Sequence, residues 1–227
     1  MPTAHEVRDV MSTEPVTVTR LTPFKDLVEL FSSRRISAAP VLDSRNRVVG
    51  VVSQTDLLPK EAFRDHEPSR REQLLHLEEM LKAGGTTAGD LMTAPAVVIG
   101  PHAGLAEAAR LMARHHVRRL PVIDGREQLV GVVSQSDLLT VFLVPDQQLA
   151  DTVTARIAHA LPDADTSSLT VSVTDGVVTL GGELTDTSRL PALVQTARRV
   201  EGVVDTEIHL DRKHHRIDPP PDFGALY

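Results

Sequence analysis

An internal duplication constrains this sequence more than any other feature. A shift of 81 residues, without a gap, aligns residues 9–58 with residues 90–139, and 17 of the 50 aligned pairs are identical. Both copies end on Gly-Val-Val-Ser-Gln, one variable residue and Asp-Leu-Leu, at 50–58 and 131–139. Because repeats fold as similar units, we expect two related halves in the first two thirds of the chain.

Each copy shows the same order of secondary-structure signals. A short β-branched run, at 16–18 or 97–99, precedes a segment with apolar residues at helical spacing. Two more strands flank a polar turn, and the Asp-Leu-Leu segment opens a second helix. The paired strands are expected at 40–42 and 48–53 in the first copy, and at 121–123 and 129–134 in the second. The pattern predicts a β-α-β-β-α unit that occurs twice.

The Pro-Val-(Leu/Ile)-Asp run and the Gly-Val-Val-Ser-Gln-x-Asp-Leu-Leu segment of each copy resemble tandem CBS (cystathionine β-synthase) domains over residues 7–141. Such domains pair into a Bateman module, which usually associates into a homodimer through its helices. The resemblance therefore implies an α+β fold and a likeness to regulatory proteins. It also implies a homodimer.

Candidate binding residues stand where the last strand of each copy meets the following helix. Ser53 and Asp56 are three residues apart, and so are Ser134 and Asp137. This spacing is typical of a helix cap, because a serine hydroxyl can accept from backbone amides and an aspartate complements the helix dipole. The same geometry suits an anion site, so both interpretations stay open.

The family resemblance implies which ligand these residues would bind. Many CBS modules bind AMP, ADP, ATP or S-adenosylmethionine as a regulatory ligand, and no further cofactor is implied. By this resemblance, Ser53 and Ser134 contact phosphate, and Asp56 and Asp137 hold the ribose. The adenine is expected between Thr17 and Ala39-Pro40 in the first copy, and between Val98 and Leu120-Pro121 in the second.

The two copies differ in charge. Arg118 and Arg119 precede Leu120 in the second copy, whereas Ser37 and Ala38 stand at the matching positions of the first. Guanidinium groups can neutralise a polyphosphate through charge-assisted hydrogen bonds. Either these arginines form a solvated surface run, or they favour the second copy as the site for a multiply charged nucleotide.

Several function classes are excluded or disfavoured. The chain of 227 residues has no cysteine, which excludes disulfides, zinc-thiolate sites and thiol catalysis. The adjacent pairs His115-His116 and His214-His215 lack a third ligand at a suitable spacing, so no metal site is expected. We find no nucleophile elbow and no phosphate loop, and we therefore expect no enzyme. The N-terminus has no signal-peptide pattern, which predicts a cytoplasmic protein.

The segment between the copies predicts a helix. Ser69 to Glu72 forms a capping-box pattern, leucines follow at positions 74, 77 and 81, and Gly84-Gly85 is a stop signal. We expect this helix to pack against the module or a second subunit.

The C-terminal third starts a new pattern after Val144-Pro145. Asp146 is expected to cap a helix, Asp175-Gly176 to form a hairpin turn, and a second helix and last strand to follow. This α-β-β-α-β unit, with Gly-Val-Val-Thr-Leu-Gly-Gly at its hairpin, resembles a BON domain over about 147–211. BON domains are described as phospholipid-binding or envelope-associated, often in bacterial stress proteins.

Charge argues against lipid or nucleic acid as the partner of this unit. Residues 147–211 contain four arginines, no lysine and ten acidic residues, a net charge of -6. Anionic lipid attracts basic segments and nucleic acid needs a basic face, so we expect a protein partner instead.

The predicted organisation follows from these patterns. The predicted limits are a tail at 1–6, CBS domain 1 at 7–68, a helix and linker at 69–87, CBS domain 2 at 88–144, a BON domain at 145–211 and a flexible tail at 212–227. The leading hypothesis is a sensor that binds an adenosyl nucleotide and relays its state to the BON domain or a partner. The alternatives are an interaction protein with vestigial clefts and an envelope-associated stress protein acting through its BON domain.

Overall fold

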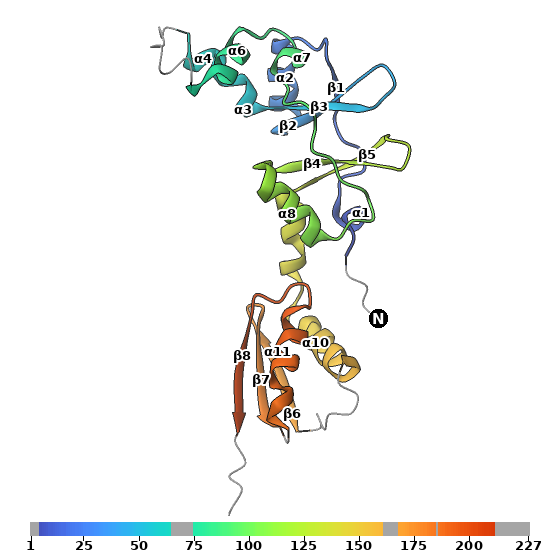
Figure 1. The fold of residues 1–227 in the computed structure, drawn as a ribbon, viewed down its shortest axis with the longest axis vertical. Coiled ribbons are helices and arrows are strands. Elements are labelled where there is room, and N and C mark those ends of the chain that lie inside the picture. The colour runs from blue at the N-terminus through green and yellow to red at the C-terminus, as the bar shows by residue number, and fades with distance from the viewer. Residues whose placement is uncertain (1–4, 65–74, 161–167, 185, 212–227) are drawn as a thin grey trace, which may run out of the picture. The chain divides into compact units, whose positions relative to one another are not determined.

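The computed structural model describes residues 5–64, 75–160, 168–184 and 186–211. The chain divides after Leu139 into two compact units, each with its own hydrophobic core (Figure 1). The first unit holds both copies of the repeat, and the second holds the C-terminal third. The predicted capping box at 69–72, the pair His214-His215 and the tail at 212–227 lie outside the described residues.

The first unit repeats one order of helices and strands. Its first half comprises α1 (Val7–Val10), β1 (Val18–Thr19), α2 (Phe24–Arg34), β2 (Ala38–Leu42), β3 (Val48–Ser53), α3 (Gln54–Leu57) and α4 (Pro59–Ala62). Its second half comprises α6 (Leu77–Gly84), α7 (Ala88–Leu91), α8 (Leu105–His115), β4 (Arg119–Ile123), β5 (Leu129–Ser134) and α9 (Gln135–Leu138). The predicted β-α-β-β-α order is confirmed in the first copy.

One predicted strand is wrong. The run 97–99 forms only a single parallel bridge, between Ile99 and Val122. The equivalent β1 is also short, because only Val18 and Thr19 pair with β2. In each copy, the β-branched run pairs with the next strand through only one or two residues. The register of this pairing is the same in both copies.

The duplication is visible in backbone detail. The shift of 81 residues converts the strand pair Val18–Val41 into the pair Ile99–Val122. Helices α2 and α8 both end at a residue in the left-handed conformation, Arg35 with φ of 51° and His116 with φ of 54°. This conformation at the helix end frees the chain to turn into the next strand.

The two copies exchange their leading segments. The Ser12 amide donates to the Val132 carbonyl oxygen of the second copy at 3.0 Å, and the Thr93 amide donates to the Val51 carbonyl oxygen of the first at 2.9 Å. Next to each of these hydrogen bonds, a glycine packs against a methionine of the exchanged segment. A Cβ added to Gly50 would lie 2.6 Å from Met92 Sδ, and a Cβ added to Gly131 would lie 2.7 Å from Met11 Sδ. Each copy therefore completes its fold with residues from the start of the other.

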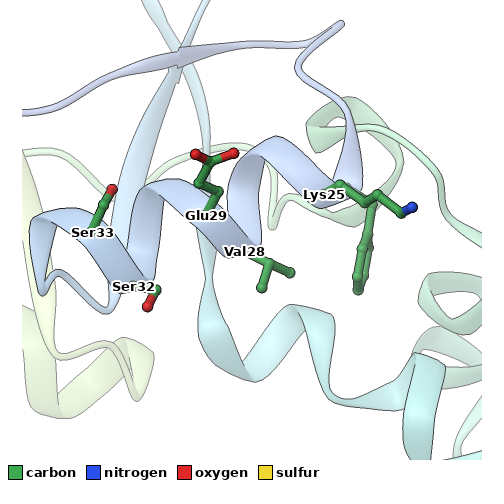
Figure 2. A pocket seen from close by; sticks show the side chains of 6 residues that line it. Lys25, Val28, Glu29, Ser32 and Ser33 are labelled. Atoms are coloured by element: carbon green, nitrogen blue, oxygen red, sulfur yellow. The ribbon is translucent and has the colours of Figure 1, made fainter.

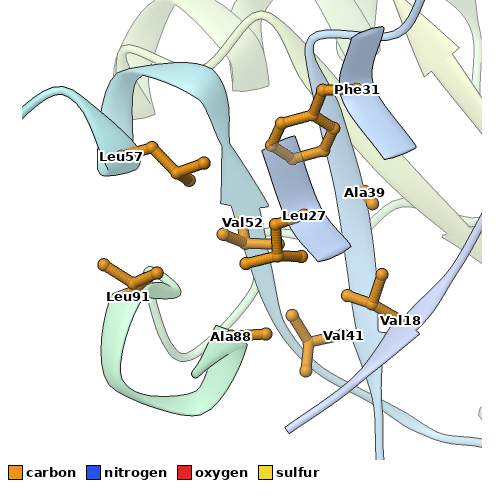
Figure 3. Close-up of a cluster of buried hydrophobic side chains, with 9 residues drawn as sticks. All are labelled: Val18, Leu27, Phe31, Ala39, Val41, Val52, Leu57, Ala88 and Leu91. Carbon is orange, nitrogen blue, oxygen red and sulfur yellow. The ribbon is translucent and has the colours of Figure 1, made fainter. Parts of the chain in front are cut away.

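The core of the first copy shows the exchange in side chains. Leu27 and Phe31 of α2 pack against the buried strands, and Ala88 and Leu91 of α7 enter the same cluster from the segment before the second copy (Figure 3). All four side chains are at most 3% exposed. Burying apolar side chains of both segments makes the two halves one structural unit.

The second unit has an α-β-β-α-β order. It comprises α10 (Asp146–Ala160), β6 (Leu169–Thr174), β7 (Val177–Glu183), the short 3-10 helix η2 (Thr187–Arg189), α11 (Leu190–Arg198) and β8 (Asp205–Asp211), and η1 (Leu139–Leu143) leads into it. The sheet order is β6-β7-β8, with β7 and β8 parallel. The Asp175-Gly176 turn is confirmed: both residues have positive φ, as a type I′ hairpin requires.

Asp146 has a different role from the one predicted. It lies inside α10 rather than before it, and its carboxylate accepts from the amides of Asp175 at 2.8 Å and Gly176 at 3.0 Å. The capping prediction is wrong because the exposed amides of the hairpin turn compete for the same carboxylate. Asp146 thus ties the helix to the hairpin.

Within the described ranges, no helix is both long and apolar enough to cross a membrane.

Candidate functional site

The strand-to-helix junction of the first copy has a well-defined hydrogen-bond frame. Ser53 ends β3, and Asp56 lies in the first turn of α3. Both the backbone amide and the hydroxyl of Ser53 donate to Asp56 Oδ2, at 2.7 and 2.6 Å. The capping interpretation is confirmed, because the two residues form a capping box.

The second copy repeats this frame. The Ser134 amide and hydroxyl donate to Asp137 Oδ2 at 2.7 and 2.6 Å, and the Asp137 amide donates back to Ser134 Oγ at 3.4 Å. All four side chains of the two junctions are partly exposed rather than buried. In each copy Oδ2 therefore accepts two hydrogen bonds from the serine.

The arginines of the second copy lie beside its serine. Arg119 pairs directly with Ser134 across β4 and β5, so their side chains stand on the same face of the sheet. Arg118 is more exposed, and its carbonyl accepts from the Gln135 amide at 3.0 Å. In the first copy Ala38 occupies the position of Arg119, opposite Ser53. Only the second junction therefore has a guanidinium opposite its serine.

The residues expected around adenine lie on neighbouring strands. Thr17 is exposed and directly precedes β1, which pairs with the strand that holds Ala39 and Pro40. Val98 directly precedes Ile99, which bridges to the strand that holds Leu120 and Pro121. Ala39, Pro40, Leu120 and Pro121 are buried, so their side chains belong to the core.

Lys82 of α6 is a site residue that the sequence analysis missed. Its ammonium donates to Asp56 Oδ1 at 2.7 Å, and the side chains of Lys82 and Asp56 are only 12% and 11% exposed. The same ammonium lies 3.2 Å from Thr93 Oγ1 and 3.3 Å from Glu78 Oε1. An ammonium has three hydrogens, and these three acceptors can use them all.

The ion pair keeps Lys82 charged. Burial alone would lower the pKa of Lys82, but hydrogen bonds and charge from Asp56 and Glu78 outweigh it and raise the pKa above its ordinary value of 10.5. The ammonium is therefore fully protonated at neutral pH. The favourable contribution of this raised pKa to stability is present below pH 10.5, and is lost only as the pH rises through the higher folded-state value.

Two hollows open on the first copy, and neither is lined by Ser53 or Asp56. One, of about 550 Å³, lies along α2; Figure 2 shows Val28 and Ser32 on one side of this helix and Glu29 and Ser33 on the other. The other, of about 390 Å³, includes Thr17 among its lining residues. Among the described residues, no group of three or more histidine or acidic side chains is arranged to hold a metal ion.

Comparison with protein families assigns both copies of the repeat and the second unit, but not helix α6. The CBS domain matches residues 7–61 and 88–144, and the BON domain matches residues 145–211. The chain belongs to the CBS-domain family, as a tandem pair followed by a BON domain. The resemblance drawn from the two motifs is confirmed.

Individual relatives match the CBS pair. The chain is 29% identical to protein MJ1426 of Methanocaldococcus jannaschii, over 59% of this chain and 88% of that one. It is 30% identical to the chloroplastic protein CBSX2 of Arabidopsis thaliana, over 52% of this chain and 54% of that one, so it spans about half of the plant protein. A solved structure of CBSX2 in complex with AMP superposes with a TM-score of 0.54 at 30% identity, over 61% of this chain and 97% of that one.

Proposed function

We propose that this protein is a regulatory sensor that binds an adenosyl nucleotide in its CBS clefts. The observation that carries the proposal is the likeness to CBSX2, whose solved structure holds AMP on the same fold at 30% identity. The paired serine and aspartate of each junction supply a hydroxyl and a carboxylate, the groups that suit a phosphate and a ribose. AMP, ADP, ATP and S-adenosylmethionine all carry the ribose.

We assign the second junction as the site for a nucleotide with more than one phosphate. Arg119 stands opposite Ser134 on the same sheet face, where it can meet a phosphate that contacts the serine. Ribose hydroxyls would donate to Asp137, and adenine would lie near Val98 and the backbone of Leu120. The Ser134 hydroxyl donates to Asp137, so this hydroxyl must turn away from the carboxylate to donate to a phosphate.

The test is a thermal-shift series with AMP, ADP, ATP and S-adenosylmethionine. A ligand at 100 times its Kd stabilises the fold by about 2.7 kcal/mol, which raises the melting temperature measurably. The shift should disappear in Asp137→Ala. Asp90→Ala is the matched control, because Thr87 and Asp90 form the same capping box outside both junctions. No shift with any of the four ligands would contradict the proposal.

A regulatory role is proposed in place of catalysis. CBS-pair relatives give the chain its family, and in both described junctions the serine hydroxyl donates to an aspartate rather than to a histidine. Incubation with ATP should therefore yield no ADP or AMP above a buffer blank. Steady turnover would contradict this part of the proposal. A place in the cytoplasm and in a bacterial stress response stays a prediction from the family resemblance.

We propose that the CBS pair forms a homodimer through α2. Val28 is 47% exposed and lines the larger hollow with Phe24, so this helix offers an apolar strip to a second copy (Figure 2). Val28→Glu should convert a dimer to a monomer in light scattering after size exclusion. Leu21→Glu, at a residue 82% exposed outside that strip, is the control.

We propose a protein partner for the BON domain, because its net charge of -6 repels anionic lipid. Liposomes containing phosphatidylserine should not co-sediment with the protein at moderate salt. Co-sedimentation that salt weakens would favour the alternative of an envelope-associated protein.

A further inference from the structure

The carboxylate that would hold a ribose in the first copy is already engaged by a residue outside the repeat. Asp56 Oδ2 accepts two hydrogen bonds from Ser53, which fill its two lone pairs. Asp56 Oδ1 accepts from the Lys82 ammonium at 2.7 Å. Lys82 therefore occupies one of the two lone pairs of Oδ1, so the two ribose hydroxyls cannot both bind this oxygen while Lys82 stays in place.

Lys82 is also hard to displace. Its bond to Asp56 joins two charged groups, and such bonds are about twice as strong as those a neutral hydroxyl makes. The ammonium has Glu78 and Thr93 as further acceptors, and its side chain is only 12% exposed. A ribose that displaced it would exchange an ion pair for neutral hydrogen bonds.

The helix that carries Lys82 is fixed from a second point. The Lys60 ammonium donates to the carbonyl oxygen of Ala83, the residue next to Lys82, at 3.0 Å. Lys60 holds this helix end through a backbone carbonyl, whereas Lys82 holds it through the Asp56 carboxylate. This difference allows the ion pair to be separated from the general attachment of α6.

We infer that Lys82 closes the first junction to nucleotides by occupying the carboxylate that would bind the ribose. The inference rests on the proposed function, because it assumes that Asp56 is a ribose ligand whenever it is released. Lys82 is thus a residue that restricts access of a nucleotide to the first junction.

The test isolates the first junction by removing Asp137 from the second. Titration calorimetry would measure AMP binding to Asp137→Ala alone and combined with Lys82→Met. We expect the double variant to bind AMP at least tenfold more tightly. Lys60→Met in the same background should bind as Asp137→Ala does, because it loosens α6 without releasing Asp56. Lys82→Gln, which keeps a hydrogen-bonding group without the charge, provides a second variant.

Each outcome decides the inference. Unchanged or weaker AMP binding in both Lys82 variants would overturn it, and a weaker binding would show that the lysine contacts the nucleotide instead. An equal gain in Lys60→Met would also overturn it. If the unaltered protein binds AMP while the Lys82 variants show no gain, the proposed function stands and only the inference fails. If no protein in the series binds any adenosyl nucleotide, both fail.

Discussion

The two junctions share one hydrogen-bond frame but carry positive charge in different places. In the first copy Lys82 pairs with the carboxylate of Asp56, whereas in the second Arg119 lies opposite Ser134. The serine-to-aspartate distances are identical, at 2.6 and 2.7 Å in both copies. Both copies keep the same hydrogen bonds between serine and aspartate. The two junctions differ in the cationic side chain beside these bonds, which is Lys82 in the first copy and Arg119 in the second.

The largest expected effect is on the free energy of unfolding, through the hydrophobic core of each copy. Leu27 is fully buried in the first copy, and the matching residue of the second is Ala108. Leu27→Ala should lower the free energy of unfolding by about 2–5 kcal/mol through lost transfer energy and a cavity. Ala108→Gly should cost about 1–2 kcal/mol. Chemical denaturation measures both, with exposed Leu21→Ala as control; equal losses would contradict this asymmetry.

The exchanged segments predict a smaller effect. A Cβ on Gly131 would lie 2.8 Å from the Ser12 carbonyl oxygen, while one on Gly50 would lie 3.0 Å from the Thr93 carbonyl oxygen. Gly131→Ala should therefore destabilise the fold by about 1–3 kcal/mol, and by more than Gly50→Ala. Gly125→Ala is the control, because no atom lies within 4 Å of its Cβ position. Denaturation that ranks Gly50→Ala as the more harmful change would count against the packing described.

The charge difference predicts a change in ligand preference. Arg119→Ala should reduce the ratio of ADP to AMP affinity by about tenfold, since it removes one charge-assisted hydrogen bond. Arg118→Ala should change that ratio less, because this side chain is more exposed and its backbone makes the contact with α9. Calorimetry with both nucleotides would show the order of the two variants. A reversed order would place the phosphates elsewhere.

The smallest expected effect is on acid unfolding, and it differs between the turn at 43–47 and the turn at 124–128. Hydrogen bonds from the Arg47 backbone, its side chain and the Arg45 amide lower the pKa of Asp43. A lowered pKa stabilises the fold above pH 3.8 and loses that contribution as the pH falls through the folded-state value. Arg47→Ala should therefore move acid unfolding to a slightly higher pH. Gln128→Ala should leave it unchanged, because Gln128 meets Asp124 through its backbone amide, at 2.9 Å.

Repetition made most of the fold predictable from the sequence. Two aligned copies fixed the order of helices and strands, and the Asp175-Gly176 dipeptide indicated its hairpin because both residues tolerate positive φ. Local patterns misplaced the strand at 97–99 and the role of Asp146. Both depend on which partner lies across the fold, and a local pattern contains no such information.

Only the site residues that lie inside the repeat could be predicted from the sequence. Ser53, Asp56, Ser134 and Asp137 follow from the motif, but Lys82 comes from the linker helix, 26 residues after the aspartate that it contacts. The capping-box pattern at 69–72 and the leucines indicated a helix, without indicating which face meets α3. The one available signal was a lysine near the end of a predicted helix, and lysines there usually complement the helix dipole.

The most direct measurement is a crystal structure of the protein with ADP. We predict nucleotide at the second junction, with ribose hydroxyls on Asp137 and phosphates near Ser134 and Arg119, while Lys82 stays on Asp56. Nucleotide at the first junction with Lys82 displaced and the second junction empty would contradict it. So would ADP bound away from both aspartates.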